Sequence, residues 1–161
     1  MSTTHRYQAR CSWSGSTGAG YDVYDRAHRA VAAPAATTLD LSGDRAFLGD
    51  PARLNPEQLL LIAASSCQLL SFLAVAARAR IDVVAYEDQA EGVMPEDDPP
   101  TRFTSITLRP AITVRAPGSG APPSLERVQR LVHLAHEECY IANSLRTEIT
   151  VDAVIEILPS A

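Results

Sequence analysis

A chain of 161 residues, 46% of them hydrophobic, is long enough and apolar enough to form one domain with its own core. Its net charge of −5 and isoelectric point near 5.3 argue against the partners that attract basic proteins, namely nucleic acids and anionic membrane surfaces. The sequence has three cysteines and no recognisable targeting segment, so we expect a cytoplasmic protein whose thiols stay reduced.

The N-terminal third is predicted to be extended, because its residues alternate in polarity and its breaks are rich in glycine. We expect strands at 6–13, 21–33 and 37–41, a hairpin turn at 15–20, and a long ordered loop over the rest of 34–53.

Residues 54–77 are predicted to form the helix around which the chain is organised. Asn55 is a suitable N-cap, Pro56 suits the first helical position, and Gln58 completes the spacing of a capping box. Apolar and small residues then surround the helix, and Cys67 lies in its middle. In a soluble chain this pattern indicates a helix buried on all sides, and the polar residues within it argue against a membrane span.

The C-terminal half alternates extended segments with one amphipathic helix. We expect strands at 81–92, 103–114 and 147–158, and a proline-rich solvent loop at 95–100. A linker ends at Ser124, a plausible cap for a helix whose buried stripe reaches Cys139. This order of elements predicts an α+β fold in a single domain over 1–161.

Two cysteines, Cys67 and Cys139, lie on predicted buried helices. A single buried cysteine usually packs as a small hydrophobic residue, but a pair fits peroxide chemistry, in which a second thiol traps the sulfenic acid formed on the first. The reactive thiolate also needs a cation or a hydrogen-bond donor nearby. Arg26 is the cation we consider, on the same face of its predicted strand as His28. The alternative for Arg26 is an ordinary exposed arginine.

Several segments resemble the OsmC/Ohr family of thiol-dependent organic hydroperoxide reductases. They are L-N-P-E-Q-L-L at 54–60, A-A-S-S-C at 63–67, A-H-E-E-C-Y-I-A-N-S-L-R at 135–146 and the closing β-branched strand. Two more, G-D-P-A-R at 49–53 and A-Y-E-D-Q-A-E-G at 85–92, are similar to the OsmC-like branch. The resemblance covers nearly the whole chain. It implies an OsmC-like fold, with antiparallel sheets packed on two core helices, in an intertwined homodimer.

The resemblance also implies roles for four residues. Cys67 would be the peroxidatic cysteine, Cys139 the resolving one, and Glu57 and Arg26 would complete the site. The implied reaction reduces an organic hydroperoxide through a Cys67 sulfenic acid and a Cys67–Cys139 disulfide, which an external dithiol reduces, with no metal or organic cofactor. The chain departs from the family at Tyr140, where the second cysteine is usually followed by proline.

A distance argument leads to the same homodimer. Glu57 and Cys67 are ten residues apart on one predicted helix, so they lie about 15 Å apart along its axis. If both belong to one site, the simplest arrangement takes Glu57 and Arg26 from a second chain, and two-fold symmetry then creates two equal sites.

Two other functions remain open at this point. A metal site would use His136 and Cys139, three residues apart, together with Cys67, although structural zinc usually has four ligands with short paired spacings. A non-catalytic module would bind a small apolar ligand in the dimer cleft while both thiols stay inert. Consumption of a hydroperoxide and metal analysis would separate the three functions.

Overall fold

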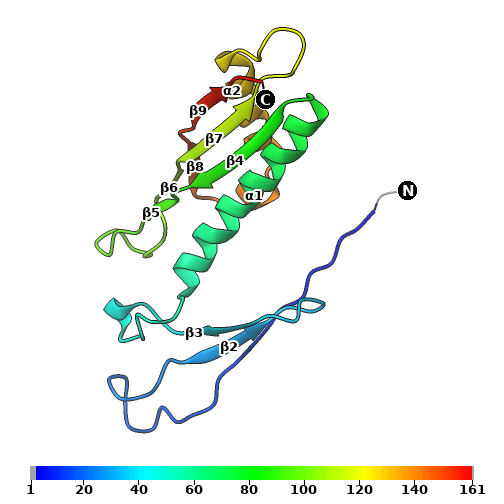
Figure 1. The fold of residues 1–161 in the computed structure, drawn as a ribbon. Coiled ribbons are helices and arrows are strands. Elements are labelled where there is room, and N and C mark those ends of the chain that lie inside the picture. The colour runs from blue at the N-terminus through cyan, green and yellow to red at the C-terminus, as the bar shows by residue number, and fades with distance from the viewer. Residues whose placement is uncertain (1–2, 161) are drawn as a thin grey trace. The chain divides into compact units, whose positions relative to one another are not determined.

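The structure is a computed structural model that describes residues 3–160, and it divides into two compact units. The N-terminal unit ends at Leu60 and the C-terminal unit begins at Leu61, so the boundary falls inside the long helix α1 (Pro56–Arg78). Figure 1 shows the elements of each unit. The single domain over 1–161 stays a prediction.

The N-terminal unit contains one antiparallel sheet in the order β1–β2–β3. Its strands are β1 (Arg10–Ser12), β2 (His28–Val31) and β3 (Thr38–Leu41). All three predicted strands exist, but the first two are much shorter than the alternation indicated.

Arg26 lies in a loop before β2, so the prediction that it shares a strand face with His28 is wrong. Two sets of local hydrogen bonds explain the difference. The Asp25 carboxylate accepts from the Ala27 N–H, and the Arg26 guanidinium donates to the carbonyls of Tyr21 and Tyr24. Side chains thus take up backbone groups that a longer strand would have paired in its ladder.

The segment from Ser42 to Asn55 is an ordered loop, as predicted, and contains the 3-10 helix η1 (Arg45–Phe47). Asp44 caps η1 through the Ala46 N–H and accepts a second hydrogen bond from the Asn55 amide. The buried Ser42 hydroxyl accepts from the Asp50 N–H. These bonds tie both ends of the loop to the start of α1.

Helix α1 begins with the predicted capping box. The Gln58 N–H donates to the Asn55 side chain at 2.8 Å, and the Asn55 N–H donates to the Gln58 side chain at 3.1 Å. The reciprocal pair satisfies two backbone donors that the helix itself leaves unpaired.

The prediction that α1 is buried on all sides is wrong for the single chain. One face is buried, whereas Ile62, Leu70 and Leu73 on the other are 51%, 63% and 39% exposed. One chain supplies only one layer to pack against this helix. By length and composition α1 could also cross a membrane, a property that core helices of soluble proteins share.

Two three-stranded sheets form the C-terminal unit, with orders β4–β7–β9 and β5–β6–β8. Their strands are β4 (Asp82–Asp88), β5 (Glu91–Val93), β6 (Ser105–Leu108), β7 (Pro110–Arg115), β8 (Glu148–Val151) and β9 (Val154–Leu158). Each of the three predicted C-terminal strands is divided in two, because it passes from one sheet to the other. The proline-rich segment 95–100 is a loop, as predicted.

The α+β class is confirmed, but the expectation of antiparallel sheets holds only in part. β4–β7 and β5–β6 are antiparallel, whereas β6–β8 and β7–β9 are parallel. The parallel pairs follow from the crossover through α2 (Leu125–Glu137) and α3 (Tyr140–Ser144), which returns the chain to the same end of the sheets.

Two groups of buried apolar residues hold α1 in the C-terminal unit. Phe72, Val75 and Ala76 of α1 pack with residues of β7 and α2, while Ala64 packs with Ile106, Leu108 and Ile149 of the other sheet. Helix α2 is capped by Ser124, as predicted, through the Arg127 N–H. Cys67 lies on α1 between Ala64 and Phe72. Packing of the helix on either side of Cys67 therefore holds this residue in place.

Candidate active site

Cys67 and Cys139 are brought together in the C-terminal unit. Cys67 is partly exposed in the middle of α1, Cys139 is 1% exposed between α2 and α3, and both are free thiols. Burial, above all, raises the pKa of Cys139 to about 11, and a hydrogen bond with Cys67 and its charge act in the same direction. The two thiols are therefore neighbours, and a charge on one affects the other.

A backbone donor lies at the sulfur of Cys67. The Ile141 N–H, in the first turn of α3, donates to Cys67 Sγ at 3.5 Å. The backbone N–H groups of Ala142 and Ile141 also bond to the Cys139 sulfur and partly oppose the rise in its pKa. Negative charge on either sulfur thus meets fixed N–H dipoles from one short segment.

Cys139 is buried, as predicted, but it lies beyond the end of the amphipathic helix. Helix α2 ends at Glu137, and Cys139 is the residue before the short helix α3. Tyr140, 81% exposed, occupies the first position of α3. A proline is tolerated at that position, because its missing N–H would be unpaired there anyway. The first position of α3 thus accepts either residue, and Tyr140 in place of the usual proline leaves the helix intact.

Two polar side chains with buried polar atoms, Gln68 and Tyr86, lie in the same unit as the thiol pair, and the sequence pattern did not single them out. Gln68, next to Cys67, is 1% exposed, and its amide donates to the Val132 carbonyl of α2 at 3.2 Å. Tyr86 of β4 packs on Phe72, with ring centroids 6.0 Å apart. Burial first, then the charges of Asp88 and Cys139, raise the pKa of Tyr86, so its phenol stays neutral.

The metal-site alternative has no geometric support. Within residues 3–160, no group of three or more His, Cys, Asp and Glu side chains is placed to hold a metal ion. Cys67 and Cys139 lie together, but His136 does not complete a set of ligands with them. His136 Nδ1 is instead a buried atom with no hydrogen-bond partner among residues 3–160.

Arg26 and Glu57 belong to the N-terminal unit and form no ion pair with one another in the described part of the chain. The Arg26 guanidinium lies 4.1 Å from the ring centroid of Tyr24 and 4.7 Å from that of Tyr21. Glu57 is in the first turn of α1, and its buried Oε2 atom has no hydrogen-bond partner in the described residues. Their roles stay predictions.

Glu57 and Cys67 both lie on helix α1, ten residues apart in the sequence. At 1.5 Å per residue, the two are about 15 Å apart along its axis, beyond the reach of their side chains.

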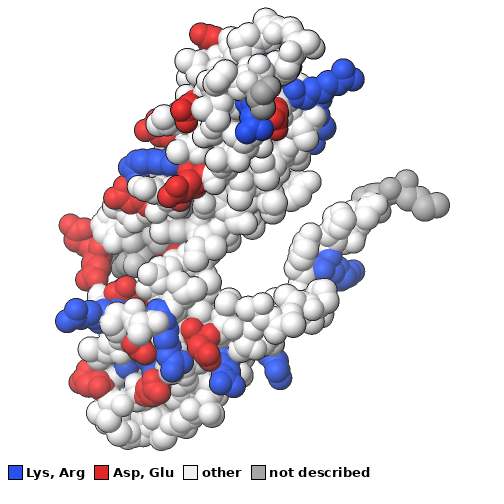
Figure 2. Space-filling view, in the orientation of Figure 1, with Lys and Arg blue, Asp and Glu red and all other residues white. Residues whose placement is uncertain are grey.

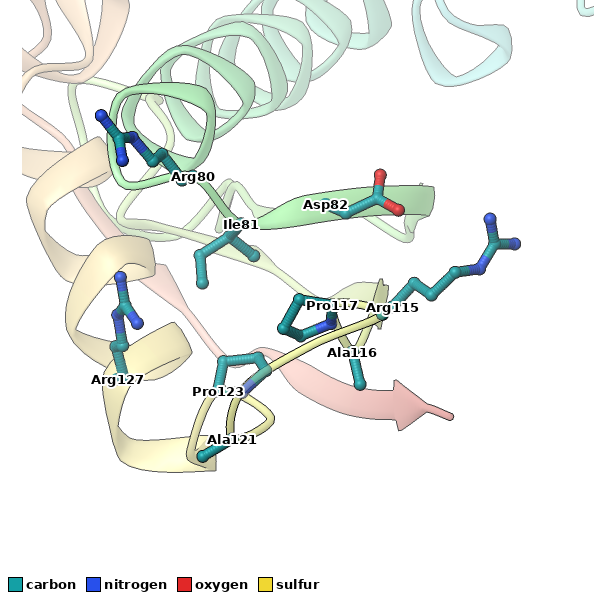
Figure 3. Close-up of a pocket in the computed structure, with 10 residues that line it drawn as sticks. Arg80, Ile81, Asp82, Arg115, Ala116, Pro117, Ala121, Pro123 and Arg127 are labelled. Atoms are coloured by element: carbon teal, nitrogen blue, oxygen red, sulfur yellow. The ribbon is translucent and has the colours of Figure 1, made fainter. Parts of the chain in front are cut away.

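A second hollow, a pocket of about 280 Å³, lies at the end of α1. Figure 3 shows that Arg80 and Arg115 lie at opposite edges of it and point away from one another across Ile81, Pro117 and Pro123. No thiol or histidine lines it. On the face drawn in Figure 2, acidic and basic side chains are interspersed, with no continuous basic area.

The comparisons agree on one family and one fold. A model of the OsmC family, described as OsmC-like protein, matches residues 49–154. An OsmC-like protein of unknown function from Vibrio cholerae is 28% identical, with a TM-score of 0.82 over 94% of this chain and 100% of that one. No curated protein matches the sequence.

Two organic hydroperoxide resistance proteins share the fold at lower identity. The one from Elizabethkingia anophelis is 19% identical, with a TM-score of 0.69 over 97% of this chain and 99% of that one. The one from Legionella pneumophila, called OsmC and a predicted redox protein, is also 19% identical, with a TM-score of 0.65 over 96% and 99%.

Proposed function

Because this chain belongs to the OsmC family of OsmC-like proteins, we propose that it is a thiol-dependent peroxidase that reduces organic hydroperoxides to alcohols. One observation carries the proposal: a partly exposed thiol, Cys67, lies beside a buried thiol, Cys139, with a backbone N–H directed at the first. The solved organic hydroperoxide resistance proteins with the same fold support it.

The proposed first half-reaction takes place at Cys67. Its thiolate attacks the distal oxygen of the hydroperoxide, an S–O bond forms, and the O–O bond breaks. The alkoxide leaves, takes up a proton and becomes the alcohol, while Cys67 is oxidised to sulfenic acid. The Ile141 N–H, 3.5 Å from Sγ, favours the thiolate from which the attack begins.

The second half-reaction joins the two thiols. Cys139, protonated near neutral pH because its pKa is raised to about 11, loses its proton as its sulfur attacks Cys67. An S–S bond forms, the S–O bond breaks, and hydroxide leaves as water with that proton. An external dithiol then reduces the disulfide. Over the cycle, one hydroperoxide and one dithiol give one alcohol, one water and one disulfide.

In the proposed enzyme, Arg26 and Glu57 act on the Cys67 of a second copy in a homodimer. The distance along α1 supports this arrangement, because Glu57 cannot reach the Cys67 of its own helix. The exposed apolar face of α1, with Ile62, Leu70 and Leu73, is a surface that a second copy would remove from water. The Arg26 guanidinium would stabilise the thiolate, and Glu57 would orient it.

A peroxidase assay tests the proposal. Purified protein with dithiothreitol should consume cumene hydroperoxide, and Cys67→Ser should not. Cys11→Ser is the matched control, since Cys11 is an exposed thiol of the other unit and should be dispensable. Undiminished turnover in Cys67→Ser would contradict the mechanism. Binding of an organic ligand with no turnover in the intact protein would favour the non-catalytic module.

A further inference from the structure

A pocket of about 460 Å³ in the N-terminal unit has aromatic walls. The whole chain has only nine aromatic residues, one Trp, five Tyr and three Phe, and four of them line this pocket. The four are Trp13, Tyr21, Tyr24 and Phe47. This volume lies within the range of sites that bind small organic molecules.

The rings of this aromatic pocket are held in place. The Trp13 indole N–H donates to the Asp25 carbonyl at 2.7 Å, and the Trp13 ring meets Tyr24 edge to face, with centroids 6.3 Å apart at 87°. Tyr21 meets Tyr24 in the same way, at 6.2 Å and 74°. The walls are therefore largely formed before any ligand arrives, which lowers the entropy lost on binding.

These rings are not core residues. Trp13 is 42% exposed, Tyr21 61% and Phe47 37%. Apolar rings gathered at one exposed hollow, with polar groups among them, are typical of a binding site.

The charged side chain that lines the pocket is a cation, Arg26. Arg26 and His28 line it, and no Asp or Glu does, although acidic residues outnumber basic ones 19 to 14 in the chain. Arg26 donates one bond each from Nη1 and Nη2 to backbone carbonyls, and within residues 3–160 its Nε–H makes no hydrogen bond. His28 uses Nδ1 toward the Arg26 carbonyl, which leaves Nε2. The pocket thus complements an acceptor oxygen.

We propose that the aromatic pocket binds a planar aromatic molecule that carries an acceptor oxygen. The ring lies against the aromatic walls, and the oxygen faces Arg26 and His28. A consequence follows if the proposed function holds. Arg26, which lines the pocket, then lies beside the Cys67 thiolate of the second copy, and the pocket holds the organic part of the hydroperoxide. The enzyme then prefers aryl hydroperoxides to saturated ones of equal size.

The only tryptophan of the chain, Trp13, reports on this pocket by its fluorescence. The probes are 2-phenyl-2-propanol and its saturated counterpart 2-cyclohexyl-2-propanol, titrated into full-length Cys67→Ser, which has no peroxidase chemistry to interfere. We expect a saturable change with the phenyl compound and about three- to tenfold weaker binding of the cyclohexyl one, because stacking and cation–π contacts are lost.

Phe47→Leu keeps the wall apolar but removes one ring, so it should weaken binding of the phenyl compound several-fold and that of the cyclohexyl compound little. Tyr7→Leu is the control, since Tyr7 is an aromatic of the same unit, 90% exposed and outside the pocket. If Phe47→Leu fails to fold, Trp13→Leu read by calorimetry makes the same test.

Equal affinity for the two probes, or no saturation, would overturn the inference. Peroxidase turnover without ring-selective binding would overturn only this inference. Ring-selective binding without turnover would support it and overturn only the proposed function.

Discussion

The two cysteines of the candidate site differ in their access to solvent, and this difference fits the roles that we propose for them. In the proposed mechanism a hydroperoxide reaches the partly exposed Cys67, whereas burial shields Cys139, which is 1% exposed. Cys139→Ser should therefore react once and then accumulate sulfenic or over-oxidised Cys67, since no second thiol traps it. Mass spectrometry after one equivalent of cumene hydroperoxide would detect the added oxygen. A full catalytic rate in Cys139→Ser would show that the resolving thiol lies elsewhere.

The buried thiol of Cys139 also links stability to pH. Burial and the neighbouring Cys67 raise its folded pKa from 9.0 to about 11, so the folded state favours the neutral thiol. This contribution is complete below pH 9 and is lost as the pH rises through about 11. A shift of this size corresponds to a loss of about 2–3 kcal/mol at most.

Urea unfolding under reducing conditions at pH 8 and pH 10.5 should show this loss, and Cys139→Ala should lose less between the two values. Tyr86, whose pKa is also raised, is present in both proteins, and because burial is the main cause of its shift, most of its contribution cancels in the comparison. Equal losses in the two proteins would contradict the assignment.

Residues whose partners are local could be predicted from the sequence, and those whose partners are distant could not. The capping box of Asn55 and Gln58 and the cap at Ser124 depend on neighbours three residues away, and both are confirmed. The sequence does not predict the hydrogen bond of Gln68, because its partner, the Val132 carbonyl, lies 64 positions away. Arg26 was placed on a strand because alternation does not reveal that its side chain caps its own loop.

At the scale of elements, Gln68 is one of the direct links between α1 and α2. Its amide N–H donates to the Val132 carbonyl of α2, which stabilises the fold. Its Oε1 is buried without a hydrogen-bond partner in the described residues, which destabilises the fold. Gln68→Met removes both effects at similar volume and should change the free energy of unfolding by less than about 1 kcal/mol. Gln68→Ala leaves a cavity and should cost about 2–4 kcal/mol.

Chemical denaturation of the two Gln68 variants beside wild type checks this difference. Similar large losses in both would mean that the hydrogen bond, and not the packing, holds the helices together.

The strands show where periodicity stops being informative. Alternation continues across Gln89–Ala90, across Arg109 and across Asp152–Ala153, so each extended segment reads as one strand. The break in each depends on which sheet the chain joins next, a matter of pairing with residues far along the sequence. The same limit explains the parallel pairs β6–β8 and β7–β9, whose direction is set by the crossover through α2 and α3.

For the whole molecule, the proposed shared site makes a prediction about mixtures. One variant carries Arg26→Ala and Glu57→Ala, and the other carries Cys67→Ser. Each should be nearly inactive alone. After subunit exchange, each mixed dimer has one intact site, so a statistical mixture should recover about a quarter of wild-type activity.

Native mass spectrometry must confirm the exchange of subunits. Confirmed exchange without recovered turnover would mean that Arg26 and Glu57 act within their own chain, or do not act on Cys67. A wild-type protein that stays monomeric at assay concentration would contradict the shared site at once.

The placement of Cys67 before β4 and of Cys139 after α2 has a topological consequence. A disulfide between them closes a loop that contains β4, β5, β6, β7 and α2, most of the C-terminal unit. In the chain-entropy model, closing a loop of about 70 residues disfavours the unfolded ensemble by about 4 kcal/mol. A molecule that has reacted with peroxide and awaits its reductant would thus be harder to unfold, and slower to be digested by proteases, than the reduced molecule it came from.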